Sequence, residues 1–224
     1  MSVSDNVKYV RERMAEAAVR SGRNPEDVSL VAVTKSTDAE HVRELMACGV
    51  DKLAENRVQM LRDKQKDIEG AEWHLIGHLQ TNKVKDVVGR VSLIQSLDSV
   101  RLAKEIDRIS GNRGIITDCL CEVNIFREES KSGLYGEEVP EFLGMMGEFH
   151  NIRVRGLMSM APVDAEEAEI RKGFSKMFKI FVDNSNTMMH NIDMSILSMG
   201  MSRDFEYAIL EGANYVRIGR RLFV

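Results

Sequence analysis

One lysine of this chain stands where it could act as a nucleophile. Lys35 follows the apolar run Leu30–Val33 and a threonine, so it falls at the end of a predicted strand. The amine of a lysine can attack an aldehyde and hold it covalently as a Schiff base. Taken alone, a lysine at a strand end is more often a solvated charge. Its chemistry therefore depends on which groups the other elements bring beside it.

Two segments near the C-terminus carry groups that suit a phosphate. Residues 198–202 (SMGMS) offer two hydroxyls and a glycine, and Asp204 opens the next predicted helix. Arg217 and Gly219 come at the end of the last apolar run. Backbone N–H groups at a glycine turn and a helix start favour an anion, and an arginine adds a permanent cation. The simpler interpretation of the first segment is a helix N-cap by Ser202 or Asp204.

The elements that would position these groups alternate between short apolar runs and amphipathic stretches. This alternation predicts parallel strands joined by right-handed helical crossovers. Strands are predicted over 28–35, 52–55, 73–79, 91–97, 115–125, 152–160, 192–199 and 214–218. Helices are predicted over 4–21, 38–49, 58–68, 83–88, 100–110, 137–149, 165–189 and 204–210.

These units predict an α/β fold, a single (β/α)8 TIM-type barrel with an extra N-terminal helix and one domain over residues 1–224. A six-stranded open sheet is the competing architecture, because the strands at 52–55 and 214–218 are the weakest. In a barrel the C-terminal strand ends meet at one mouth, and its last loops often hold phosphate. That mouth favours a phosphate-bearing aldehyde cofactor, and a phosphosugar-binding enzyme fits nearly as well. The residues expected there are Lys35, Asn56, Ser198 and Arg217.

The composition argues against several other classes of protein. The 224 residues carry a formal net charge of −4, which argues against nucleic-acid binding. No apolar run approaches the roughly 20 residues that span a bilayer, and the charged N-terminus has no secretory pattern. We therefore expect a cytoplasmic protein without a membrane partner. Cys119 and Cys121 share one strand face and are expected to pack, and the scattered histidines predict no metal site.

The motifs at these strand ends resemble the pyridoxal phosphate homeostasis protein family, which is related to the N-terminal barrel of alanine racemase. The resemblance covers nearly the whole chain, from Leu30 to Phe223. No single motif is decisive, but their order is highly specific. The motifs are VAVTK ending at Lys35, AENRVQ at 54–59, HLIGHLQTNK at 74–83, EVN at 122–124, EESKSGL at 128–134, RGLMSMAP at 155–162, LSMGMSRDFEYAI at 197–209 and VRIG at 216–219.

The resemblance implies a barrel that holds pyridoxal 5′-phosphate covalently. Lys35 would carry the cofactor as a Schiff base, Arg217 would face the pyridine nitrogen, and Asn56 would lie beside the cofactor. It assigns no role to His74 or Lys83. The phosphate would be held at the ends of the last two strands by Ser198, Met199, Gly200, Gly219 and Arg220.

The chain departs from the family pattern in two places. Phe126 and Arg127 precede the EESK motif, where small residues are usual, so this loop could shield or recognise the ligand differently. Arg220 also replaces a residue that is usually small. Its side chain could add charge at the phosphate or turn outward.

The expected function is cofactor binding rather than catalysis, and no catalytic residue is predicted. An arginine can only donate to the pyridine nitrogen, which disfavours deep carbanion chemistry, although related racemases tolerate the same arrangement. Racemisation needs a base on each face of the substrate, and nothing after Val224 supplies the second one. The tyrosines within the barrel are expected to pack, namely Tyr135, Tyr207 and Tyr215.

We therefore expect a protein that takes part in pyridoxal phosphate homeostasis. It would limit free cofactor and supply it to apo-enzymes that depend on pyridoxal phosphate, as a monomer or weak dimer. One alternative is a weak fold-type III pyridoxal phosphate enzyme, either an amino-acid racemase or a lyase. The other is a phosphosugar-binding barrel enzyme without this cofactor.

Overall fold

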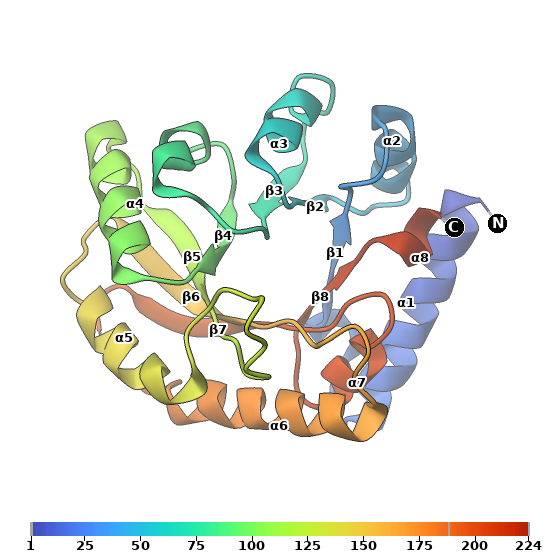
Figure 1. Ribbon diagram of the computed structural model, residues 1–224. Helices are drawn as coiled ribbons and strands as arrows, with labels where there is room; N and C mark the ends of the chain where they lie inside the picture. Colours follow the sequence, from blue (N-terminus) through green and yellow to red (C-terminus); the bar gives the residue numbers. More distant parts are fainter. Residues whose placement is uncertain (1, 188, 224) are drawn as a thin grey trace.

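Eight parallel strands close into a barrel in the computed structural model, which describes residues 2–187 and 189–223 (Figure 1). Each strand pairs with the next one in sequence, and β8 pairs with β1. The barrel is the predicted one, and the open six-stranded sheet is excluded. The strands are β1 (Ser29–Val33), β2 (Lys52–Glu55), β3 (Glu72–Leu75), β4 (Leu93–Leu97), β5 (Thr117–Glu122), β6 (Ile152–Met158), β7 (Ile192–Ser198) and β8 (Tyr215–Ile218).

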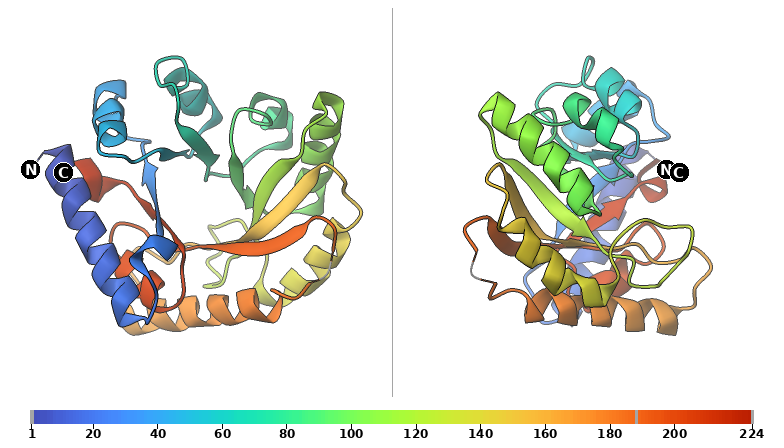
Figure 2. Two further views of the ribbon diagram at one scale, coloured as in Figure 1. Left: turned by 180° about the vertical axis from the view of Figure 1, so that it is seen from behind. Right: turned by 60° about the vertical axis from the view of Figure 1, so that its left-hand side comes forward.

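Helices lie around the outside of the strands (Figure 2). The α-helices are α1 (Val3–Arg20), α2 (Ala39–Ala47), α3 (Val58–Lys64), α4 (Val100–Arg113), α5 (Val139–Met146), α6 (Glu167–Asp183), α7 (Phe205–Leu210) and α8 (Arg220–Phe223). Three 3₁₀ helices accompany them, namely η1 (Pro25–Asp27), η2 (Thr81–Asp86) and η3 (Gly136–Glu138). Within the described part of the chain, no helix is long and apolar enough to cross a bilayer.

The N-terminal helix packs against the last helices of the chain. Ser2 caps α1, because its hydroxyl accepts from the Asp5 N–H while the Asp5 carboxylate accepts from the Ser2 N–H. The buried face of α1, which includes Val3, Val7 and Val10, lies toward the α7 and α8 side of the barrel (Figure 1). Of these two helices, α7 in turn contacts β8, the strand that carries Arg217.

Strand side chains alternate between the barrel interior and the outer core, as the two-residue period of a strand requires. In the interior, Leu120 of β5 packs with residues of β4, β6 and β7. Cys119 and Cys121 point the other way and lie in the outer core, so packing is their role, as expected. A residue two positions after an interior residue points to the same face of its strand, and at the strand end its side chain reaches the barrel mouth. Such residues include Asn56 after Ala54, Glu122 after Leu120, and Ser198 after Ile196.

Several predicted elements are shorter in the structure. The helix predicted over 83–88 is the 3₁₀ helix η2, whose bonds join residues three apart, such as Lys83 N–H to Gln80 O (2.9 Å). The helix predicted over 165–189 ends at Asp183, because the Asn184 side chain donates to the Ile180 carbonyl. Residue 188 of that range lies outside the described residues. The helix α8 follows β8 and was not predicted.

Candidate functional site

Lys35 lies at the barrel mouth, two residues beyond the end of β1. The strand stops at Val33 because the chain then turns, with the Thr37 N–H donating to the Thr34 carbonyl at 3.0 Å. The Lys35 side chain is exposed. Its amine is therefore accessible to a ligand that enters the mouth.

A buried ion pair holds the backbone in front of Lys35. Lys64 of α3 donates to the Thr34 carbonyl and to Glu55 Oε1 (2.5 Å). The Thr34 hydroxyl donates to the same carboxylate oxygen (2.7 Å). Thr34 and Glu55 are fully buried, and Lys64 is nearly so. Because a buried carboxylate needs charged and hydrogen-bonding partners, this cluster fixes the residue that precedes Lys35.

Arg217 lies on the floor of the mouth in a chain of hydrogen bonds. Its Nη1 donates to Ser198 Oγ (2.6 Å) and its Nη2 to the Ser159 carbonyl (2.7 Å). Ser198 donates in turn to Gln95 Oε1 (2.7 Å), and Gln95 Nε2 lies 3.0 Å from His74 Nδ1. All of these residues are buried. The chain runs across the barrel interior from β8 to β3 and fixes the orientation of the guanidinium.

Arg217 stays positively charged although it is buried. Burial lowers the pKa of Arg217 to about 10, while the nearby carboxyls of Asp204 and Glu122 act in the opposite direction. The guanidinium therefore stays protonated near neutral pH and can only donate hydrogen bonds. A ligand group placed against it must be an acceptor, such as a neutral ring nitrogen or an anion.

The loops after β7 and β8 are joined at the mouth. The Gly219 N–H donates to Ser202 Oγ (3.2 Å), and the Arg217 N–H donates to the Gly200 carbonyl (2.9 Å). Gly200 has a φ of 92°, and a Cβ there would lie 2.6 Å from Ala208 Cβ. Only glycine fits this turn. The two loops thereby bring a hydroxyl and a backbone amide side by side.

The other predicted site residues lie around this floor. The Met199 N–H donates to the Tyr215 carbonyl (3.1 Å), so this amide is engaged in the sheet. Asn56 is half-buried, and Gly77 packs so closely on its backbone that a Cβ would lie 2.1 Å from the Asn56 carbonyl oxygen. Arg220 is exposed at the start of α8. The structure thus links Ser198, Gly200, Arg217 and Gly219 closely, while Lys35, Asn56 and Arg220 lie at the rim.

The residues that the sequence left without a role are also placed. His74 belongs to the floor and stacks on Tyr215 at a ring distance of 6.2 Å, whereas Lys83 is exposed on η2.

The two residues that depart from the family pattern lie in the loop after β5, where Phe126 packs edge-on against Phe174 of α6 at 6.0 Å. Arg127 lies 4.8 Å over the Tyr135 ring and pairs with Glu137. The loop after β5 therefore folds back onto η3 and α6.

Glu122 is a residue of the mouth that the sequence interpretation did not single out. It ends β5 with 4% of its surface exposed. Its Oε2 has no hydrogen-bond partner among residues 2–187 and 189–223. Burial, followed by the Asp98 charge, raises the pKa of Glu122 to about 7. The signal was present in the stretch CLCE, where two-residue alternation puts Glu122 on the face opposite both cysteines.

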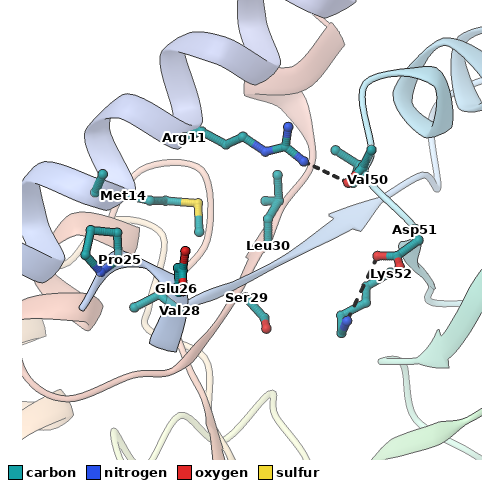
Figure 3. Close-up of a pocket in the computed structure, with 12 residues that line it drawn as sticks. Arg11, Met14, Pro25, Glu26, Val28, Ser29, Leu30, Val50, Asp51 and Lys52 are labelled. Atoms are coloured by element: carbon teal, nitrogen blue, oxygen red, sulfur yellow. Dashed lines mark hydrogen bonds and ion pairs between the residues drawn. The ribbon is translucent and has the colours of Figure 1, made fainter. Parts of the chain in front are cut away.

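A separate pocket of about 410 Å³ lies at the other end of the barrel (Figure 3). It is lined by α1 and by the beginnings of β1 and β2, including Ser29 and Lys52. Arg11 crosses it and donates to the carbonyls of Cys48 and Gly49, both at 2.8 Å. Because it borders the N-terminal strand ends, this pocket is separate from the candidate site.

Comparisons with known proteins now identify the family. Residues 4–224 match the family described as alanine racemase, N-terminal domain. A relative from Aquifex aeolicus named pyridoxal phosphate homeostasis protein is 39% identical over 226 residues, covering 100% of this chain and 98% of the relative. The chain belongs to the pyridoxal phosphate homeostasis protein family. The Escherichia coli K12 protein of the same name is 32% identical over 226 residues, covering 99% and 95%.

Solved structures agree with this family. A protein of unknown function from Bifidobacterium adolescentis has a TM-score of 0.93 at 34% identity, covering 99% of this chain and 94% of that one. PipY of Synechococcus elongatus, solved with pyridoxal phosphate bound, has a TM-score of 0.82 at 32% identity, covering 96% and 100%. An alanine racemase of Clostridium difficile shares the fold, with a TM-score of 0.73 at 16% identity over 56% of its own chain. The predicted family and fold are confirmed.

Proposed function

We propose that this protein binds pyridoxal 5′-phosphate at the barrel mouth and takes part in its homeostasis. Three kinds of group lie at one barrel mouth and support this proposal: an amine, a buried guanidinium, and a backbone amide beside a hydroxyl. These are the exposed amine of Lys35, the buried Arg217–Ser198 pair and the Gly219–Ser202 contact. They match an aldehyde, a ring nitrogen that accepts a hydrogen bond, and a phosphate. The name of the family and the cofactor bound by PipY support the same assignment.

The residues on β1, β2 and β8 would hold the reactive half of the cofactor. When bound, the cofactor supplies an aldehyde that joins a primary amine as a Schiff base, and Lys35 is the amine we assign. The buried ion pair of Lys64 and Glu55 holds the backbone before it. Arg217 would donate to the ring nitrogen and leave it unprotonated. Asn56, directly after β2, would lie beside the cofactor.

The loops after β7 and β8 would hold the phosphate. A Cβ at Gly219 would lie 3.2 Å from the Val33 carbonyl oxygen, so a side chain there would crowd the strand end beside Lys35. Ser202 joins the proposed contacts because its hydroxyl already accepts from the Gly219 N–H. Because the hydroxyl accepts in that contact, it can still donate its own proton to an anion. The proposed phosphate contacts are Ser198, Gly200, Ser202, Gly219 and Arg220, and Met199 contributes only the backbone beside them, because its N–H donates to the Tyr215 carbonyl.

We further propose that the protein, acting as one domain in the cytoplasm, holds the cofactor and passes it to apo-enzymes as a monomer or weak dimer. A strong racemase would need a base on each face of its substrate. The tyrosines offer little support for that role. Tyr215 stacks on His74 in the floor, and Tyr135 lies under Arg127.

Absorption spectroscopy tests the covalent assignment. The wild-type protein and the Lys83→Ala control should each develop the absorption band of an imine when mixed with pyridoxal phosphate. Lys35→Ala should lack it and keep its free energy of unfolding within about 0.5 kcal/mol, because the side chain is exposed. Retention of the band in Lys35→Ala would overturn the assignment.

Hydrogen exchange separates the carrier from the weak enzyme. The loaded protein is incubated with L-amino acids in deuterated water, and in parallel with an apo-enzyme that needs the cofactor. The proposal predicts transfer of the cofactor to the apo-enzyme without turnover of the amino acids. Rapid exchange of the α-proton together with turnover would instead identify a racemase or lyase.

A further inference from the structure

The carboxyl group of Glu122 lies across the barrel mouth from Lys35. In a closed barrel whose strands follow chain order, β5 stands four strands from β1 in either direction. Figure 1 shows these two strands on opposite sides of the barrel. Leu120 packs in the barrel interior, so the side chain of Glu122, two residues later, points to the same interior face at the strand end. The two groups therefore border one mouth from opposite walls.

Glu122 lacks the partner that a buried carboxyl needs. Only 4% of the residue is exposed, and within the described residues Oε2 has no hydrogen-bond partner. The charged or titratable groups around it are Asp98 after β4, His78 after β3, Lys131 in the following loop, and Arg217 on β8. The neighbouring strand β6 pairs Met158 with Glu122 and brings no charge at that position. This oxygen is therefore free to accept a hydrogen bond from a ligand that enters the mouth.

The ionisation of Glu122 suits proton exchange near neutral pH. Burial raises its pKa to about 7, with Asp98 acting in the same direction and Arg217, His78 and Lys131 against it. Both forms of the carboxyl are then populated near neutrality. A group of this kind can take a proton from a ligand and give it back.

The carboxyl of Glu122 has one acidic neighbour, Asp98, and three basic ones, Arg217, His78 and Lys131. Asp98, which has an 11% exposed side chain, adds a second carboxylate nearby. A hollow of about 540 Å³ between the loops after β3 and β4 is lined by His78, Asp98, Ser99 and Arg101, among others. A small molecule with a primary ammonium group could place its nitrogen beside the Glu122 carboxyl, with the Asp98 carboxyl nearby.

We propose that Glu122 binds the primary amine that displaces Lys35 from the cofactor and accepts the proton of its ammonium group. The inference rests on the proposed function and specifies its chemical partner, namely a primary amine. A primary amine such as that of lysine is protonated near neutral pH and cannot form a bond to carbon until it loses a proton. Glu122 is placed to remove it.

The exchange balances in atoms and protons. One proton moves from the ammonium nitrogen to a Glu122 carboxylate oxygen, which leaves a neutral amine. This nitrogen would form a double bond to the carbon that Lys35 holds, its two hydrogens would pass to the Lys35 nitrogen, and the bond from that carbon to the Lys35 nitrogen would break. The released Lys35 amine takes up one proton, and Glu122 gives up the one that it accepted. Net proton count is unchanged.

The rate at which loaded protein releases cofactor to different amines tests the inference. Glu122→Gln keeps the size of the side chain and removes its basicity, and Glu129→Gln makes the same charge change at an exposed position of the next loop. With free L-lysine, release from Glu122→Gln should be about a hundredfold slower than from wild type or the control. With hydroxylamine, which is already neutral near pH 7, the three rates should agree.

A loss of rate with both amines, or with neither, would overturn the role of Glu122. An apo-enzyme as acceptor distinguishes the two sources of amine. If Glu122→Gln slows release to free L-lysine alone, the amine recognised is that of a free amino acid, and if it slows both, a lysine of the recipient is also recognised. If wild-type protein forms no imine band at all, the proposed function fails, and this result differs from every outcome above.

The cofactor-free protein provides a second measurement that does not depend on release. Carboxyl carbon NMR of wild-type protein should show one resonance that titrates near pH 7 and is absent from Glu122→Gln. Asp98→Asn removes a neighbouring negative charge and should move that midpoint, and the midpoint of the release rate with it, to lower pH. A Glu122 resonance that titrates near its ordinary value would contradict the inference.

Discussion

The amine of Lys64 reaches from α3 to the carbonyl of Thr34, directly before Lys35, and also binds Glu55. Lys64→Met would leave the fully buried Glu55 carboxylate without its charged partner, at a cost of about 3–5 kcal/mol in the free energy of unfolding. Imine formation at Lys35 should weaken as well, since the preceding backbone loses its anchor. Chemical denaturation and cofactor titration measure the two effects.

Lys66→Met is the matched control for this prediction. Lys66 is exposed and pairs with Asp63 at 2.7 Å on the protein surface, so its loss should cost only about 0–1 kcal/mol. Similar losses of stability in the two variants would show that the buried pair has no special role. A stable Lys64→Met variant with unchanged cofactor binding would do the same.

Among individual residues, the sequence predicted the functional groups at strand ends and missed the helix residue Lys64, which packs against them from the outer side. Lys35 and Arg217 follow or end apolar runs, so counting strands was enough to bring them to one mouth. Lys64 lies on a helix among other charged residues, and nothing in its neighbours shows that it turns inward to Glu55. Its burial follows from the path of α3 over β2, which no local pattern encodes.

At the scale of elements, the turn from β7 into α7 depends on one glycine. Gly200 has a φ of 92°, and a Cβ there would lie 2.9 Å from Phe205 Cα. Gly200→Ala should therefore cost about 1–3 kcal/mol and weaken cofactor binding, because the phosphate loop must shift. Thermal unfolding and cofactor titration measure these losses.

Gly144→Ala provides the opposite case. Gly144 lies inside α5, and a Cβ there would meet nothing within 4 Å. The substitution should stabilise the protein by about 0.5–1 kcal/mol and leave cofactor binding unchanged. If Gly200→Ala is as well tolerated as Gly144→Ala, the turn does not require glycine.

All eight strands were predicted, and their ends were less certain. Parallel strands inside a barrel are mostly apolar on both faces, which makes the longer ones easy to find, whereas the short β2 and β8 were the weakest in the sequence. The predicted third strand ran to residue 79, but β3 stops at Leu75. The close packing of Gly77 on the Asn56 backbone is a contact between distant residues, and apolar periodicity carries no information about it.

At the scale of the whole molecule, Glu122 should make stability depend on pH. Its pKa is raised from 4.5 to about 7 in the folded protein, so folding holds a proton that the unfolded chain releases. Stability is then lost as pH rises from about 4.5 to about 7, with a slope of up to about 1.4 kcal/mol per pH unit. Glu122→Gln removes this contribution. Relative to wild type, the variant should gain stability across that window.

Chemical denaturation at a series of pH values measures this difference, and Glu129→Gln serves as the control. The control should follow the wild-type curve. Parallel curves for wild type and Glu122→Gln would mean that Glu122 titrates at the same pH in the folded and unfolded states.

The fold and family were predictable from the whole chain, because eight motifs in order along the sequence indicate a closed barrel far more specifically than any one motif does.

The proposed covalent bond between Lys35 and the cofactor can be located by reduction followed by peptide mapping. Protein loaded with pyridoxal phosphate is treated with borohydride, which converts the imine to a stable amine, and is then digested and analysed by mass spectrometry. The account predicts a phosphopyridoxyl group on Lys35. An adduct located instead on another lysine, such as Lys131 in the loop after β5, or no adduct at all, would contradict it.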